Sequence, residues 1–278
     1  MKVVLFCGGY GMRMRGGVDL PKPLQLVGPH PLLVHVMHYY AAFGHTEFIL
    51  CLGYGATQIK ELFLTHTEAL SNDFRLRNGR IELFTTDLSQ WDVTFVDTGL
   101  DSSIGDRLAQ VRPYIGDDEM FLANYADVVC DADLDLLIER FAARPEMVVS
   151  LLAVPPQQSF HVLDLAGSNG GNGADGARPV SGIRQVSELP LWQNGGYLIM
   201  RPEIFDWLEP GKDLVEGACA RLAADGRLLA QQHRGFWKPA DTFKERAELD
   251  AMWRRGDQPW RMHPDPVLSD LEDPACTD

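Results

Sequence analysis

The chain has 278 residues, 45% of them hydrophobic, and a formal net charge of -14. This length and composition are typical of one large α/β domain, or one domain with an appendage, with enough apolar residues for a sizeable core. The negative charge disfavours non-specific binding to nucleic acid or to an acidic membrane surface.

Five cysteines lie far apart and form no Cys-x-x-Cys pair: Cys7, Cys51, Cys130, Cys219 and Cys276. Cys7 and Cys51 sit in apolar runs that predict buried strands, so the simplest interpretation is reduced thiols packed as small apolar groups. We therefore expect a cytoplasmic protein. The apolar run at the N-terminus is too short for a signal peptide, and no run approaches the length that crosses a bilayer.

Short apolar runs alternate with segments of helical length along the first part of the chain. We predict strands at residues 3–7, 47–53, 119–125 and 146–154, and helices at 31–44, 56–66 and 133–145. The first helix is expected to end at Gly44. This β-α-β alternation predicts an α/β fold with a Rossmann-like, mostly parallel twisted sheet flanked by helices. Such sheets bind ligands at the carboxyl ends of their strands.

The second half of the chain is less regular. The low-complexity stretch SNGGNGADGARP (168–179) lies between the apolar segments 163–165 and 182–186. We interpret it as the tip of a hairpin, with a functional lid as the alternative. Residues 194–200 predict another strand, and the acidic end from residue 264 onwards predicts a flexible tail.

A glycine-rich turn, GGYGMRMRG (8–16), follows the first strand. The third glycine of a dinucleotide fingerprint would fall at Met14, and no G-K-[ST] of a P-loop follows. What remains is a loop whose backbone N–H groups a polyanion can approach, with the cations Arg13, Arg15 and Lys22. Arginine gives bidentate phosphate contacts and lysine a point charge, so the segment suits a triphosphate. The alternative is a tight strand-to-helix turn with solvated cations.

Aspartates follow the strand at 119–125. Asp133 is placed to cap the helix that begins at Leu134, whereas Asp127 comes too early for that role. A carboxylate at the end of a strand suits Mg²⁺, which bridges to substrate phosphates. Asp241 either caps the helix that follows it or points a carboxylate into a cleft. Two separated aspartates and a cationic loop are the groups that metal-assisted phosphoryl or nucleotidyl transfer needs.

Several motifs carry a resemblance to a known family. GGYGMR (8–13) and LPKP (20–23) resemble the G-G-x-G-T-R and P-K-P signature of sugar-1-phosphate nucleotidyltransferases. The chain is more closely similar to the glucose-1-phosphate cytidylyltransferases at GYGATQIKELF (53–63), WDVTFVDTG (91–99), NGGY (194–197), GFWKPADT (235–242) and AMWRRGDQPW (251–260). The resemblance implies a nucleotide-diphospho-sugar transferase fold with a small β-rich sugar-binding insertion. It implies one domain over residues 1–261, with a nucleotide-binding half (1–130), an acceptor-binding half (131–261) and a tail (262–278).

The resemblance also implies a reaction, in which CMP passes from CTP to a sugar 1-phosphate, giving pyrophosphate and an NDP-sugar such as CDP-glucose. An ionised phosphate nucleophile needs no general base, so catalysis depends on positioning and charge neutralisation. By match to the motifs, the phosphate cradle is formed by Gly8, Gly9, Gly11 and Met12, while Arg13 neutralises pyrophosphate and Lys22 holds the α-phosphate. The resemblance also implies that Asp127 and Asp241 bind Mg²⁺ and that Thr98 and Arg107 contact cytosine. On the acceptor side it implies Tyr125 and Asn194, with Asn194 touching a sugar hydroxyl. The sequence leaves open whether the chain forms a homo-oligomer.

Three departures from the family pattern lie on the acceptor side: Ala126-Asp127-Val128 in place of G-D-G, Phe160-His161 in place of an aromatic-glycine pair, and Glu188-Leu189-Pro190 in place of E-K-P. The lysine missing at Leu189 holds the sugar phosphate in this family, and losing such a contact costs roughly 1.5–3 kcal/mol. We therefore expect an acceptor other than glucose 1-phosphate. Glu188 remains among the expected acceptor contacts, and Arg184 or His161 is expected to replace the lost cation.

Two other functions stay open. A metal-dependent glycosyltransferase would use Asp131 and Asp133 as a D-x-D motif, although it has no need of the triphosphate loop. A catalytically degenerate regulatory subunit would bind the nucleotide without turnover, although the retained aspartates argue against it.

Overall fold

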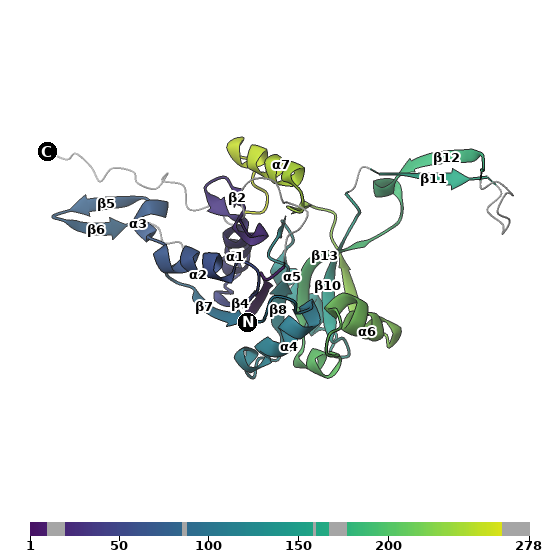
Figure 1. Ribbon diagram of the computed structural model, residues 1–278, viewed down its shortest axis with the longest axis horizontal. Coiled ribbons are helices and arrows are strands. Elements are labelled where there is room, and N and C mark those ends of the chain that lie inside the picture. The colour runs from purple at the N-terminus through teal and green to yellow at the C-terminus, as the bar shows by residue number, and fades with distance from the viewer. Residues whose placement is uncertain (10–19, 85–87, 158–159, 167–176, 263–278) are drawn as a thin grey trace.

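A twisted seven-stranded sheet forms the centre of the computed structural model, which describes residues 1–9, 20–84, 88–157, 160–166 and 177–262 (Figure 1). Its strands lie in the order β14 (Leu228–Gln232), β10 (Val149–Val154), β13 (Gln193–Met200), β8 (Phe121–Asn124), β1 (Val3–Phe6), β4 (Glu47–Leu52) and β7 (Asp92–Asp97). Strand β13 runs antiparallel to β8 and β10, and the other neighbouring pairs are parallel. The predicted mostly parallel sheet is therefore confirmed, and residues 1–130 and 131–261 contribute strands to the same sheet.

The two faces of the sheet are covered by different helices. Along β1, Val3 and Leu5 point to one face, and Val4 and Phe6 to the other, as the pleat requires. The first face packs against α1 (Leu32–Ala42), α2 (Ala56–Thr65), α5 (Leu134–Ala142) and α7 (Phe243–Arg254). The second packs against α4 (Ile104–Ile115), the π-helical segment η5 (Leu214–Cys219) and α6 (Ala220–Ala224). Predicted helices 31–44, 56–66 and 133–145 correspond to α1, α2 and α5, and Gly44 has a positive φ just after α1.

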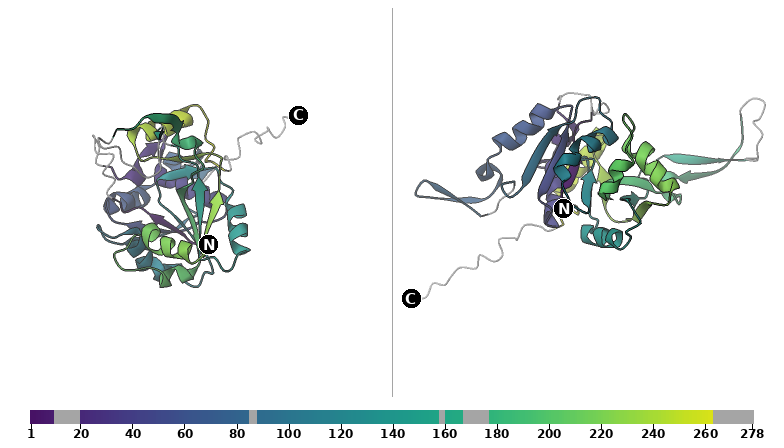
Figure 2. Two further views of the ribbon diagram at one scale, coloured as in Figure 1. Left: turned by 90° about the vertical axis from the view of Figure 1, so that its right-hand side faces the viewer. Right: turned by 90° about the horizontal axis from the view of Figure 1, so that it is seen from below.

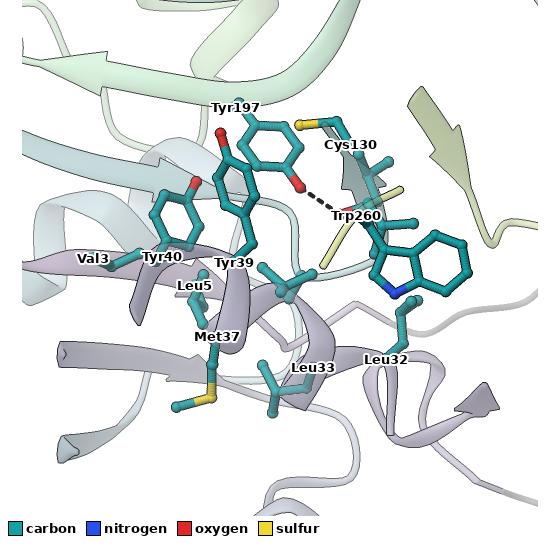
Figure 3. Packing of buried hydrophobic residues seen from close by; sticks show 14 of the residues in the cluster. Val3, Leu5, Leu32, Leu33, Met37, Tyr39, Tyr40, Cys130, Tyr197 and Trp260 are labelled. Carbon is teal, nitrogen blue, oxygen red and sulfur yellow. Dashed lines mark hydrogen bonds between the residues drawn. The ribbon is translucent and has the colours of Figure 1, made fainter. Parts of the chain in front are cut away.

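Tyrosines tie α1 to the segment that follows β8. The rings of Tyr39 and Tyr197 lie 5.2 Å apart, with Tyr40 packed against both (Figure 3). Tyr39 donates its hydroxyl to the carbonyl of Ala132 at 2.8 Å, and Tyr197 donates to that of Val128 at 3.0 Å. Buried hydroxyls with partners avoid the penalty of an unpaired polar group. These bonds hold the backbone next to Asp127.

Short pairs of strands form separate two-stranded sheets outside the central sheet. They are β2 (Leu26–Val27) with β3 (His30–Pro31), β9 (Val128–Cys130) with β15 (Trp237–Pro239), β5 (Phe74–Arg77) with β6 (Arg80–Leu83), and β11 (His161–Leu165) with β12 (Val180–Gln185). The remaining elements are α3 (Glu68–Ser71) and the 3-10 helices η2 (Lys22–Leu24), η3 (Val186–Glu188) and η4 (Pro202–Asp206). The β5–β6 and β11–β12 hairpins project from the body at opposite ends (Figures 1 and 2).

The predicted hairpin around the low-complexity stretch is confirmed as β11–β12, but residues 167–176 at its tip and the tail from 263 lie outside the described residues. Cys7, Cys51, Cys130 and Cys219 are buried free thiols, as expected. Among the helices that the structure describes, each is too short or too polar to cross a bilayer.

Candidate active site

A cleft opens at the carboxyl end of β1, where the order of the strands reverses. Strands β4 and β7 continue the sheet on one side of β1 and β8 lies on the other, so the loops after β1 and β8 diverge and leave a crevice. The cleft has a volume of about 670 Å³, within the usual range for small-molecule sites. Its lining residues are Phe6, Cys7, Gly9, Lys22, Pro23, Ile104, Tyr125, Asp127, Val128, Gln193, Asn194, Gly195, Gly196, Trp237, Pro239, Asp241 and Glu245.

The β9–β15 ribbon brings Asp127 and Asp241 together from distant parts of the sequence. Pro239 pairs with Val128 in this antiparallel ribbon. The backbone N–H of Ala240 then donates to the carbonyl of Asp127 at 2.9 Å. The two carboxylates therefore lie beside each other at the floor of the cleft.

Asp241 is not the N-cap of the helix that follows it. Thr242 caps α7, because its hydroxyl accepts from the backbone N–H of Glu245 at 3.2 Å. In turn, the backbone N–H of Thr242 donates to the Glu245 carboxylate at 2.9 Å. This reciprocal capping box satisfies the helix terminus. The Asp241 carboxylate is left to face the cleft.

Lys22 lies between the two aspartates. Its ammonium nitrogen is 2.5 Å from Oδ2 of Asp127 and also contacts Oδ1 of Asp241. Burial disfavours the ammonium, but the two carboxylates outweigh this effect and raise the pKa of Lys22 above its ordinary value. Burial raises the pKa of Asp127, and Lys22 opposes that rise. The three side chains form one charged cluster, which we call the Lys22 cluster.

The two carboxylates of this cluster fit a divalent metal whose remaining ligands come from a substrate and from water. Within the described residues, no set of three or more His, Cys, Asp or Glu side chains is placed to hold a metal ion. Asp127 and Asp241 nonetheless present hard oxygen ligands that converge on a single point, the Lys22 nitrogen. Mg²⁺ is commonly bound by one or two carboxylates, with phosphate oxygens and water completing its shell.

Arg107 lies behind the start of the glycine-rich loop, with 2% of its surface exposed. Its guanidinium donates to the carbonyls of Leu52 at 3.0 Å, Gly8 at 3.1 Å and Leu100 at 3.2 Å, and to the hydroxyl of Thr98 at 2.7 Å. A Cβ at Gly8 would overlap this guanidinium, so the close approach requires glycine there. Arg107 and Thr98 thus bond within the protein, and the described lining of the cleft does not include them.

Asn194 and Tyr125 meet in the lining of the cleft. The side-chain amide of Asn194 donates to the Tyr125 hydroxyl at 3.4 Å, and its oxygen accepts from the backbone N–H of Gly196 at 3.0 Å. Trp237 donates its indole N–H to the carbonyl of Gly195 at 2.7 Å. These bonds fix the orientation of Asn194 and Trp237 in the lining of the same cleft as the Lys22 cluster.

The structure brings together only part of the predicted site. Gly9, Lys22, Tyr125, Asp127, Asn194 and Asp241 line the cleft, whereas Gly11, Met12 and Arg13 lie outside the described residues. His161, Arg184 and Glu188 lie on β11, β12 and η3, away from the lining. The exposed Arg184 forms two bonds with Asp164, at 3.0 and 2.8 Å.

The D-x-D residues of the glycosyltransferase alternative also have partners within the protein. Asp133 caps α5, with its carboxylate accepting from the backbone N–H of Leu136 at 3.1 Å, as predicted. The carboxylate of Asp131 lies 2.8 Å from Nε2 of His233. Neither aspartate lines the cleft.

The sequence predicts no role for Gln193 or Trp237, although both line the cleft. Outside the described lining, the guanidinium of Arg234 lies 4.7 Å from the centre of the Trp192 ring. Trp237 belongs to the GFWKPADT motif, so the motif was the available signal. The Arg234–Trp192 contact joins two distant segments and has no local sequence signal.

Known proteins match the chain over nearly its full length. No protein-family model matches the chain. The chain is 32% identical to the glucose-1-phosphate cytidylyltransferase of Salmonella typhimurium, over 94% of this chain and 99% of that protein. It is 33% identical to the probable glucose-1-phosphate cytidylyltransferase of Bacillus subtilis, over 94% of this chain and 100% of that protein.

The fold is also similar to solved structures. A putative glucose-1-phosphate thymidylyltransferase from Bacillus anthracis superposes with a TM-score of 0.64 at 17% identity, covering 91% of this chain and 95% of that one. The identity over nearly the full length of the cytidylyltransferases is the stronger finding, because it covers both halves of the cleft. The chain therefore belongs to the glucose-1-phosphate cytidylyltransferase family of sugar-1-phosphate nucleotidyltransferases, enzymes that transfer a nucleoside monophosphate to a sugar 1-phosphate.

Proposed function

We propose that this enzyme transfers CMP from CTP to a sugar 1-phosphate, releasing pyrophosphate and forming a CDP-sugar. The observation that carries the proposal is the Lys22 cluster at the strand-order reversal, beside Gly9 at the end of β1. Phosphoryl-type transfer leaves little covalent chemistry to the protein, so catalysis consists mainly of positioning and charge neutralisation. One ammonium and two carboxylates in a cleft of this size supply those functions.

In the proposed reaction, an oxygen of the sugar phosphate attacks the α-phosphorus of CTP in line with the departing pyrophosphate. Lys22 holds the α-phosphate as a point charge, and Gly9 lets the triphosphate approach the backbone. Asp127 and Asp241 would hold Mg²⁺, which neutralises phosphate charge when bound. The Arg13 side chain, which matches the family signature, is proposed to neutralise pyrophosphate.

The acceptor is proposed to lie against Tyr125, Asn194 and Trp237. A phenol, an amide and an indole ring in one wall suit a polyhydroxyl ring that needs both hydrogen bonds and an apolar face. Asn194 is already oriented by the Gly196 N–H, so little rotamer entropy is lost when it binds a sugar hydroxyl.

Arg234 is proposed as the cation for the acceptor phosphate. Arg184 is bonded to Asp164, and this pairing compensates its charge away from the cleft. Among the described residues, Arg234 has no carboxylate partner, and its guanidinium stacks on Trp192, which directly precedes the cleft residue Gln193. A cation supplied from a different segment than the family lysine supports the proposal that the acceptor differs from glucose 1-phosphate.

A matrix of nucleoside triphosphates and sugar phosphates, scored for pyrophosphate release and product mass, tests the reaction. We expect turnover with CTP and strongest activity with an acceptor other than glucose 1-phosphate. Ordinary enzymatic turnover of glucose 1-phosphate would refute the altered acceptor. Release of a nucleoside diphosphate would indicate a glycosyltransferase, and CTP binding without product would indicate a regulatory subunit.

Two matched variants test the acceptor cation. Arg234→Met is expected to raise the KM for the sugar phosphate about tenfold, the effect of one lost charge-assisted contact, while the KM for CTP stays unchanged. Arg184→Met, which removes a similar exposed cation already paired with Asp164, is expected to change neither value. Equal effects of the two variants would contradict the assignment of Arg234.

The state of the cysteines supports a proposed cytoplasmic location. The four described cysteines are free and buried, which is compatible with a reducing compartment.

A further inference from the structure

In the structure, Lys22 contacts both carboxylates that are proposed to hold the metal. The proposed function requires Lys22 on the α-phosphate and the two aspartates on Mg²⁺, whereas in the structure all three are committed to one another. We propose that Lys22 is a built-in counter-cation of the metal site, released when a nucleotide binds, so that Mg²⁺ and nucleotide bind with positive coupling. This inference rests on the proposed function and adds to it a defined order of events.

The charges of the cluster favour competition between Lys22 and a metal. Two carboxylates and one ammonium carry a net charge of about −1, and a divalent cation in place of the ammonium would bring it to about zero. An ammonium and a metal ion on the same carboxylate oxygens would repel each other at short range. The Lys22 side chain is 15% exposed and that of Asp127 23%, so water screens this repulsion weakly at Asp127, and more strongly at Asp241, which is 41% exposed.

The backbone around Lys22 restricts the change to its side chain. Lys22 begins η2 between Pro21 and Pro23, whose rings fix their φ angles. Its carbonyl accepts from the backbone N–H of Gln25 at 3.1 Å. Only the flexible four-carbon side chain is then free to turn from the carboxylates to a phosphate.

The nucleotide acts on the metal in two separable ways. Its phosphates supply metal ligands that the described residues lack, since they provide only two converging carboxylates. Its α-phosphate also attracts Lys22 and frees the carboxylates. Replacing Lys22 by methionine removes the second effect and keeps the first.

Direct binding of Mn²⁺, used as a paramagnetic probe for Mg²⁺, tests the inference in the full chain. Electron paramagnetic resonance would measure free Mn²⁺ with wild type and Lys22→Met, with and without CTP, in the absence of any acceptor. We expect Lys22→Met to bind Mn²⁺ about 10- to 100-fold more tightly than wild type without CTP, the range for losing one or two charge-assisted contacts. The enhancement of Mn²⁺ affinity by CTP should fall in the variant, and by linkage so should the enhancement of CTP affinity by Mn²⁺.

Three further variants define the outcome, each first checked for native circular dichroism. Lys22→Arg keeps the cation and should behave like wild type. Lys238→Met removes a nearby cation that is bonded to Glu248 at 2.6 Å, and should leave Mn²⁺ binding unchanged. Asp241→Asn should weaken Mn²⁺ binding with or without Lys22, and a lack of effect would overturn the inference by placing the metal elsewhere.

Mn²⁺ affinity in Lys22→Met that is equal to or below that of wild type would also overturn it. The measurement needs no transfer reaction. A failure to form any CDP-sugar would therefore refute the proposed function while the Mn²⁺ result still decides the role of Lys22.

Discussion

His35 in α1 is held as a neutral imidazole, and this predicts a pH-dependent loss of stability. The side chain is 4% exposed, with Nε2 at 2.8 Å from the carbonyl of Val27. The indole N–H of Trp260 donates to Nδ1 at 3.4 Å, so Nδ1 keeps its lone pair and Nε2 carries the proton. Protonation of Nδ1 would set two N–H groups against each other. Burial accordingly lowers the pKa of His35 from 6.5 to about 4.

The sign and size of the effect follow from proton linkage. Between the unfolded pKa of 6.5 and the folded pKa of about 4, the unfolded state binds a proton that the folded state does not. The free energy of unfolding therefore falls as the pH falls through this window. The full difference is about 3 kcal/mol, of which about 2 kcal/mol is lost between pH 7 and pH 5.

Urea unfolding of wild type and His35→Gln at pH 7 and pH 5 measures this term. Glutamine can still donate to the Val27 carbonyl but does not titrate. Between the two pH values, wild type should lose about 2 kcal/mol more than the variant. Other titrating groups, including His45, whose pKa burial also lowers, are common to both proteins and cancel. Equal pH dependence of the two proteins would refute the neutral, buried state of His35.

Three substitutions in and around the active site can be tested by urea unfolding at pH 7. Arg107→Met should lower the free energy of unfolding by about 2–4 kcal/mol, since four oxygens lose their donor; a loss below about 1 kcal/mol would contradict this. Ala126→Gly should change the free energy of unfolding by less than about 1 kcal/mol. Glycine removes the strain of the positive φ, and this gain offsets the loss of a buried methyl group and the greater entropy of the unfolded chain. A change above about 2 kcal/mol would show that one of these effects dominates. Trp237→Phe should cost about 1–3 kcal/mol because the Gly195 carbonyl loses its donor, and an unchanged value would mean that water replaces it.

The sequence predicts the parallel part of the fold well because its signals are local. The apolar run of β1 is long enough only for a strand, and the helix after it ends at a glycine that adopts the expected positive φ. The direction of β13 is different. Residues 194–200 read as a strand, but its antiparallel place between β8 and β10 depends on the path of the intervening hairpin, for which periodicity gives no signal.

Asp133 and Asp241 are both candidate helix caps in the sequence, but a local sequence signal identifies the cap correctly only for Asp133. Asp133 caps α5, as its position before Leu134 predicts. Asp241 precedes Thr242, and both residue types are good N-caps, so sequence alone leaves the choice open. The β9–β15 pairing decides it, because the bond from Ala240 to Asp127 holds the chain beside Asp127 just before Asp241, and Thr242 then caps the helix. The metal-binding candidate is thus defined by a long-range strand pair.

The acceptor side depends most strongly on such distant pairing. The strand register sets Val162 opposite Arg184, so that Arg184 reaches Asp164, its diagonal neighbour across the hairpin. Arg184, one of the two residues expected to replace the lost cation, is thereby paired within the hairpin. Arg234 follows β14, which lies beside β10, and β10 in turn pairs with β13, the strand that follows Trp192. The proposal that Arg234 binds the acceptor phosphate therefore depends on the strand order, which brings the segment after β14 next to Trp192, and not on a residue at the position of the lost lysine.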